Sequence, residues 1–184
     1  MRLFVACLLP EEIRERLSLV QEAAGQVSGL KWVERSNLHV TLKFLGEVRE
    51  ASAGKVERAL GFAGAPRAFT LAIRGTGAFP NTRVPRVVWA GICGGQDELA
   101  SLARSAEAAL LPYGFEREKR PFSPHITLAR AREGQIASGL SEALAGPADR
   151  DFGRFIVEEY CLMRSELLPA GPMYTVLRRY ALSG

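Results

Sequence analysis

The order of predicted elements repeats along the chain, and this repeat restricts the fold more than any other feature. A helix, a strand that carries His-x-Thr, a second helix and a pair of strands occur in that order twice. The strands and helices do not alternate strictly, as they would in a doubly wound parallel sheet. We therefore predict an α+β fold in which antiparallel sheets are backed by helices.

Hydrophobic periodicity gives the expected bounds of these elements. Apolar residues at helical spacing predict helices over residues 10–26, 51–63, 97–111 and 134–145. Apolar or alternating runs predict strands over residues 2–9, 30–33, 38–45, 69–79, 86–92, 126–131, 155–163 and 174–182. Because no low-complexity linker divides the sequence, we expect residues 1–184 to form a single domain with an internal duplication.

The composition argues against several classes of protein. Cys7, Cys93 and Cys161 are widely spaced in apolar stretches, which indicates three buried, reduced thiols rather than disulfides or a zinc site. The chain has two histidines and no tight cluster of carboxylates, so we expect neither a metal nor a cofactor. No apolar run reaches the roughly 18 residues of a membrane span. The start of the sequence is typical of a strand rather than a signal peptide, so we expect a cytoplasmic protein.

Both histidines lie in the same short motif. The motif is His39-Val40-Thr41-Leu42 in the first half of the chain and His125-Ile126-Thr127-Leu128 in the second half. On a strand, side chains at positions i and i+2 leave the same face, so each histidine points with its threonine, and the aliphatic residues point into a core. Two such strands facing each other across a groove would present two imidazoles and two hydroxyls to one small space.

This set of groups suits the cleavage of a phosphodiester without a metal ion. Imidazole titrates near neutral pH, so one copy can act as a base and the other as an acid. The threonine hydroxyls can donate to the non-bridging phosphate oxygens, where negative charge builds in the transition state. We therefore predict that His39 and His125 are catalytic and that Thr41 and Thr127 bind the substrate.

At these residues the sequence resembles the 2H phosphoesterase superfamily, specifically the RNA 2′,3′-cyclic phosphodiesterases, which are also called 2′-5′ RNA ligases. Beyond the two motifs, the resemblance extends to residues 37–46, 77–80, 85–89, 120–130 and 165–174. It implies a two-lobed fold with pseudo-twofold symmetry and a central cleft. It also implies metal-free hydrolysis of an RNA 2′,3′-cyclic phosphate end to a 2′-phosphomonoester. By this resemblance His39 protonates the leaving 3′ oxygen and His125 activates water, although a symmetric pair allows either assignment and ligation swaps the roles.

Three cations near the motifs are further candidates for substrate binding. Lys43 shares the strand face of His39 and Thr41, and Arg120 precedes the second motif at a distance from which it could reach the phosphate. Arg130 has the opposite parity to His125, so it points away from the cleft unless a bulge re-aims it. Phe44 also has core parity, so we expect it to pack rather than to stack a base.

The expected partner is RNA with a 2′,3′-cyclic phosphate end, such as a tRNA fragment, bound by a monomer that does not associate with membranes. Two other functions stay open. The first is a non-catalytic RNA- or nucleotide-binding module that uses the cleft as a phosphate clamp. The second is a phosphodiesterase that acts on small cyclic or 2′-5′ nucleotides, which the length and charge of the cleft would distinguish.

Overall fold

The computed structural model describes residues 1–63, 66–133, 137–169 and 171–184. In chain order, the described elements are β1 (Arg2–Leu8), α1 (Glu11–Ala23), β2 (Leu30–Trp32), η1 (Arg35–Asn37), β3 (His39–Glu47), α2 (Glu50–Gly61), β4 (Phe69–Phe79), β5 (Val87–Gly94), α3 (Gln96–Leu110), η2 (Leu111–Tyr113), β6 (His125–Ala131), α4 (Leu140–Ala145), η3 (Pro147–Asp149), β7 (Asp151–Val157), β8 (Glu159–Leu168) and β9 (Gly171–Ala181).

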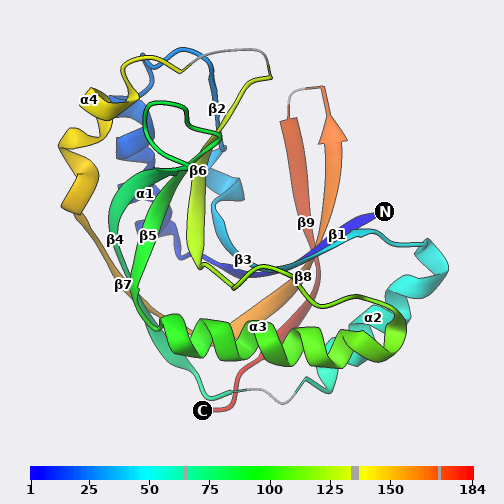
Figure 1. Ribbon diagram of the computed structural model, residues 1–184. Helices are drawn as coiled ribbons and strands as arrows, with labels where there is room; N and C mark the ends of the chain where they lie inside the picture. The colour runs from blue at the N-terminus through cyan, green and yellow to red at the C-terminus, as the bar shows by residue number, and fades with distance from the viewer. Residues whose placement is uncertain (64–65, 134–136, 170) are drawn as a thin grey trace.

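The strands form one curled antiparallel sheet in the order β7-β4-β5-β6-β3-β1-β8-β9, with β2 paired to β6. We call β1, β3, β8 and β9 the β1 half, and β4, β5, β6 and β7 the β5 half. Figure 1 shows β4, β5 and β6 on one side, β8 and β9 on the other, and α3 across the base. The prediction of a two-lobed α+β fold with antiparallel strands is confirmed.

The two halves are bound together by their helices as well as by the sheet. Helix α1 follows β1 in sequence but packs against β7 of the other half, and α3 follows β5 but packs against β3. The apolar faces of both helices join one buried core, to which α1 contributes Leu17 and α3 contributes Leu102. None of the helices in the described ranges is both long and apolar enough to cross a membrane.

The predicted strand over residues 155–163 is wrong, because the structure divides it between β7 and β8. Strand β7 pairs with β4 at one edge of the sheet, and β8 pairs with β1 near the other edge. Only Glu158 separates the two strands, and both are extended, so the apolar pattern continues across the change of partner.

Two other expectations need correction. Cys7 and Cys161 are buried free thiols as expected, but Cys93 is exposed, because it follows the buried Ile92 on β5 and faces the other side of the strand. The predicted helix over 134–145 begins at residues 134–136, which lie outside the described residues, and the observed helix α4 covers only Leu140–Ala145.

Candidate active site

The two histidine motifs lie side by side where the halves of the sheet meet. Strands β3 and β6 are joined by a single antiparallel pair, Val40 with Ile126. This register sets His39 opposite Thr127 and Thr41 opposite His125 on the face away from the core. The two histidines are therefore diagonal neighbours, which in a sheet lie about 7–8 Å apart. The two motif strands therefore do not face each other across a groove as expected. They are neighbours in the sheet, and their histidines lie on the same face.

A matching bulge lies at the last residue of each motif and reverses the faces of the residues beyond it. The pairing of β3 with β1 passes from Thr41 to Lys43, and the pairing of β6 with β5 passes from Thr127 to Ala129. The skipped residues, both leucines, stay buried in the core. A bulge adds one residue to one strand, so the alternation of faces shifts by one position.

As a result, Phe44 and Arg130 take equivalent places on the cleft side of their strands. Phe44 is 59% exposed, so the expectation that it packs in the core is wrong. Arg130 is also exposed, and it lines the same hollow as His39 and Thr127. The bulge therefore turns Arg130 toward the cleft, whereas the alternation of a regular strand would turn it away.

A backbone carbonyl two residues upstream orients each imidazole. His39 Nδ1 lies 2.7 Å from the Asn37 carbonyl oxygen, and His125 Nδ1 lies 2.9 Å from that of Ser123. A carbonyl oxygen only accepts hydrogen bonds, so both Nδ1 atoms carry the proton and donate it. Each Nε2 is then left for chemistry. In neutral His39, Nε2 accepts a hydrogen bond from the Thr41 hydroxyl at 2.9 Å.

Aromatic side chains enclose His39. Its ring centroid lies 5.0 Å from that of Phe4 and 5.4 Å from that of Tyr174, which meets it edge-on. Burial lowers the pKa of His39 below its ordinary 6.5. The hydrogen bond to Asn37 opposes this, whereas the charges of Arg130 and His125 lower the pKa further. The free protein therefore holds a neutral imidazole at this position near neutral pH.

His125 is supported by a different aromatic pair. The ring of Phe79 meets His125 edge-on at 5.4 Å and lies 5.3 Å from the ring of Trp89. Trp89 is the β5 partner of Thr127, and Phe79 lies at the end of β4, the next strand in the sheet. Trp89 therefore lies behind Phe79, whose ring contacts the imidazole.

Two hollows meet at the motifs. The smaller, of about 350 Å³, contains His39, Thr41, Thr127 and Arg130 in its wall and is bounded by β8 and β9. The larger, of about 770 Å³, contains His125, Thr41 and Arg120 and is bounded by α3. Thr41 and Phe44 line both hollows, so they stand at the boundary between them.

Lys43 borders the larger hollow, but its ammonium group is engaged elsewhere. The side chain is 3% exposed, and Nζ donates to Glu107 Oε1 at 3.0 Å and to the Glu116 carbonyl at 2.7 Å. Glu107 also accepts a hydrogen bond from the backbone N–H of Glu118 at 2.6 Å. Because of the bulge, Lys43 does not share the face of His39 as expected. Its ammonium group instead links the segment 116–118 to α3.

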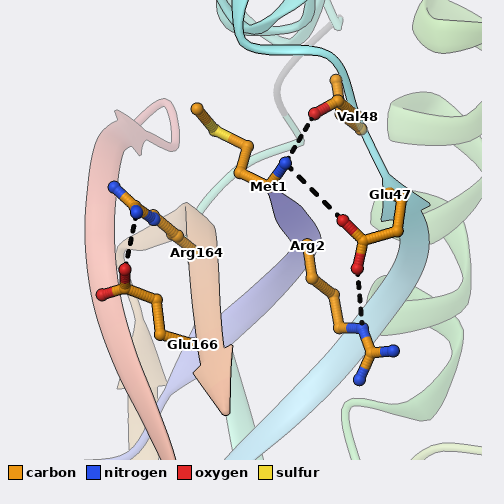
Figure 2. A network of polar contacts seen from close by, with 6 residues as sticks. All are labelled: Met1, Arg2, Glu47, Val48, Arg164 and Glu166. Carbon is orange, nitrogen blue, oxygen red and sulfur yellow. Dashed lines mark hydrogen bonds and ion pairs between the residues drawn. The ribbon is translucent and has the colours of Figure 1, made fainter. Parts of the chain in front are cut away.

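Sequence reasoning missed several residues of the smaller hollow, among them Phe4, Tyr174 and Arg2. Arg2 reaches it from β1, and Figure 2 shows its Nε directed to a Glu47 oxygen, at 3.5 Å, while the other oxygen lies 3.6 Å from the Met1 amino nitrogen. Figure 2 also shows Arg164 paired with Glu166 on the neighbouring strand β8. The signals for these residues in the sequence are the apolar run over residues 2–9, the strand pattern over 174–182 and the resemblance over 165–174, and none of them tells which strands neighbour β3.

Within the described ranges, no group of three or more histidine, cysteine or carboxylate side chains is arranged to hold a metal ion. The two adjoining hollows instead gather two imidazoles, two hydroxyls and the Arg130 guanidinium. These groups can move protons and hold an oxyanion. The curled antiparallel sheet carries these groups on its two motif strands, β3 and β6.

Comparison with known families agrees with the site. The family described as LigT like Phosphoesterase matches residues 8–89 and 94–174, one segment around each motif, and the chain belongs to this family. An RNA 2′,3′-cyclic phosphodiesterase of Archaeoglobus fulgidus is 38% identical over 97% of this chain and 98% of that protein. The chain is therefore an enzyme of the phosphoesterase class.

Solved structures show the same fold. A crystal structure of a Thermus thermophilus protein has a TM-score of 0.81 at 36% identity and covers 100% of this chain and 99% of its own. The structure of E. coli LigT complexed with 3′-AMP has a TM-score of 0.80 at 31% identity, with 100% and 98% coverage.

Proposed function

We propose that this protein hydrolyses RNA 2′,3′-cyclic phosphate ends to 2′-phosphomonoesters, with His39 and His125 as the acid–base pair. The observation that carries the proposal is the diagonal placement of the two imidazoles on one face, each with Nδ1 bound to a carbonyl, so that Nε2 is the atom that can exchange a proton. The activity for which the relatives are named and the 3′-AMP bound to E. coli LigT support this choice of substrate.

In the proposed reaction, water attacks the phosphorus atom while His125 Nε2 takes a proton from it. The bond between phosphorus and the 3′ oxygen breaks, and His39 Nε2 gives its proton to that oxygen. The phosphate stays on the 2′ oxygen. The assignment of acid and base follows the similarity to the family, and the reverse reaction, 2′-5′ ligation, exchanges the two roles.

The residues around the histidines stabilise the charge that develops on the phosphate. Thr41 and Thr127 donate hydrogen bonds to its non-bridging oxygens, and the Arg130 guanidinium, exposed on the same face, neutralises it. Arg120 borders the hollow that contains His125 and binds the RNA backbone there. A phosphate anion also favours protonated His39, which offsets the low pKa that burial gives this group in the free protein.

We propose further that one chain is sufficient and that the enzyme acts as a monomer. Both histidines and both hollows are built from residues of the same chain. In this form residues 1–184 act as one two-lobed domain, with RNA ends such as those of tRNA fragments as substrates.

The test uses an RNA that ends in a 2′,3′-cyclic phosphate, incubated with the protein in the presence of EDTA. We expect a 2′-phosphate product, and we expect His39→Ala and His125→Ala each to lose about 10²–10⁴ in rate. Circular-dichroism melting controls for folding. Full activity in either variant would refute the paired mechanism. Loss of activity in EDTA would indicate a required metal, and binding without turnover would favour a phosphate-binding module.

A further inference from the structure

A groove continues from the His125 side of the cleft beyond the catalytic groups. The larger hollow adjoins another of about 570 Å³, and both contain Lys43, Phe44, Glu118 and Arg120 in their walls. Together they exceed the roughly 300–1,000 Å³ of a site for one small ligand. The groove thus runs from His125, past Phe44, to the segment 114–120.

The side chains of this groove match a single-stranded nucleic acid. The exposed basic residues in its walls are Arg104, Arg117, Lys119 and Arg120. Phe44 and Phe122 add aromatic surface beside them. Of the three acidic residues in the walls, Glu107 is already paired with Lys43. Proteins that bind single strands combine a basic groove that follows the backbone with aromatic rings on which bases stack.

The outer wall of the groove is fixed before any ligand binds. Lys43 Nζ holds the carbonyl of Glu116 at 2.7 Å, and Glu107 holds the N–H of Glu118 at 2.6 Å, one on each side of Arg117. Both anchors are attached to regular elements, Lys43 to β3 and Glu107 to α3. A preorganised wall reduces the entropy that binding must otherwise offset.

We propose that this groove, which we call the α3 groove, binds the nucleotides that precede the cyclic phosphate, so that the enzyme selects oligonucleotides over mononucleotides. The inference rests on the proposed function and specifies its substrate class. The smaller hollow suits a long chain less well, because Leu167, Pro172 and Tyr174 of the β8–β9 hairpin bound it.

The test compares kcat/KM for 2′,3′-cyclic AMP with that for a ten-nucleotide RNA that ends in a cyclic phosphate. In the wild type we expect kcat/KM to be about tenfold or more higher for the longer substrate at low salt. In Arg104→Gln/Lys119→Gln we expect this preference to fall about tenfold. The slope of log kcat/KM against log salt should also shrink by about 1.4, since each phosphate contact on a single strand contributes about 0.7.

The matched control is Arg58→Gln/Arg178→Gln, which removes the same charge from exposed positions around a separate hollow between α2 and β9. It should leave the preference unchanged. Equal kcat/KM for the two substrates in the wild type, or an equal loss in test and control variants, would overturn the proposal.

A binding measurement separates this inference from the proposed function. Fluorescence anisotropy with a ten-nucleotide RNA that has a 3′-hydroxyl end measures the affinity of the α3 groove for RNA, because this RNA has no cyclic phosphate to hydrolyse. Weaker binding by the Arg104→Gln/Lys119→Gln variant supports the groove even if neither cyclic substrate is hydrolysed. Unchanged binding in this variant contradicts it, even if the wild type hydrolyses both substrates.

Discussion

Removing the ammonium group of Lys43 should destabilise the protein far more than a change at a surface lysine. Lys43→Met leaves the Glu107 carboxylate, whose side chain is 18% exposed, with the Glu118 N–H as its remaining hydrogen-bond donor among the described residues. Breaking a buried pair by removing one member costs about 3–5 kcal/mol. Because Glu107 keeps some contact with water, we expect the lower end of this range, about 3 kcal/mol. With a urea m-value of about 2 kcal/mol/M, the midpoint falls by about 1.5 M.

The double variant Lys43→Met/Glu107→Leu is the matched control. Replacing both charges with apolar groups of similar size is often close to neutral, so the double variant should recover most of the lost stability. Urea unfolding of the four proteins in this cycle gives the coupling energy directly. A loss below about 0.5 kcal/mol in Lys43→Met, or simple addition of the two single effects, would refute the reasoning.

The effect of Lys43→Met also depends on pH in a defined direction. Burial alone would raise the pKa of Glu107, but the hydrogen bonds from Glu118 and Lys43, with the charges of Lys43 and Arg117, outweigh it and lower the pKa. A lowered carboxyl pKa stabilises the fold above the ordinary value of 4.5, and this contribution disappears as the pH falls through the folded-state pKa. The stability gap between wild type and Lys43→Met should therefore narrow below pH 4.5.

Three further predictions concern the catalytic face. Arg130→Gln should lower kcat/KM about 10- to 100-fold, since hydrogen bonds to charged groups contribute about 1.5–3 kcal/mol, and Arg130→Lys should retain part of the activity; an unchanged rate contradicts the phosphate contact. The acid limb of the profile of kcat/KM against pH should lie below pH 6.5. As the pH rises, the first proton leaves His39, because burial lowers the pKa of this histidine. In urea unfolding, wild type should lose stability relative to His39→Gln as the pH falls from 6.5 toward the folded-state pKa, and a constant difference would exclude a neutral buried imidazole.

Much of the fold and the centre of the site could be predicted from the sequence. The repeated order of elements and the spacing of His39 with Thr41, and of His125 with Thr127, depend on local periodicity, which the sequence contains. Strand and helix bounds agree to within a few residues for most elements, such as β4 over Phe69–Phe79.

The remaining errors have a common physical origin in long-range pairing. Leu42 and Leu128 are bulged only because β1 and β5 pair with the motif strands as they do, and no local pattern indicates that register. Strand parity therefore predicts the wrong face of the sheet for Phe44 and does not decide the face for Arg130. The division of the chain at Glu158 has the same origin, since the strands on either side differ in their partners and not in their local composition.

The crossed helices make each half of the molecule dependent on the other for its covering layer. A fragment that contained only the β1 half would lack α3, and its β3 would face water along the surface that α3 now covers. Neither histidine motif could then be held by a free-standing half. A cut between α2 and β4 would leave β8 and β9 of the β1 half on the second fragment, so each fragment would lack strands that its sheet needs. The two fragments should therefore be inactive apart and regain activity when mixed.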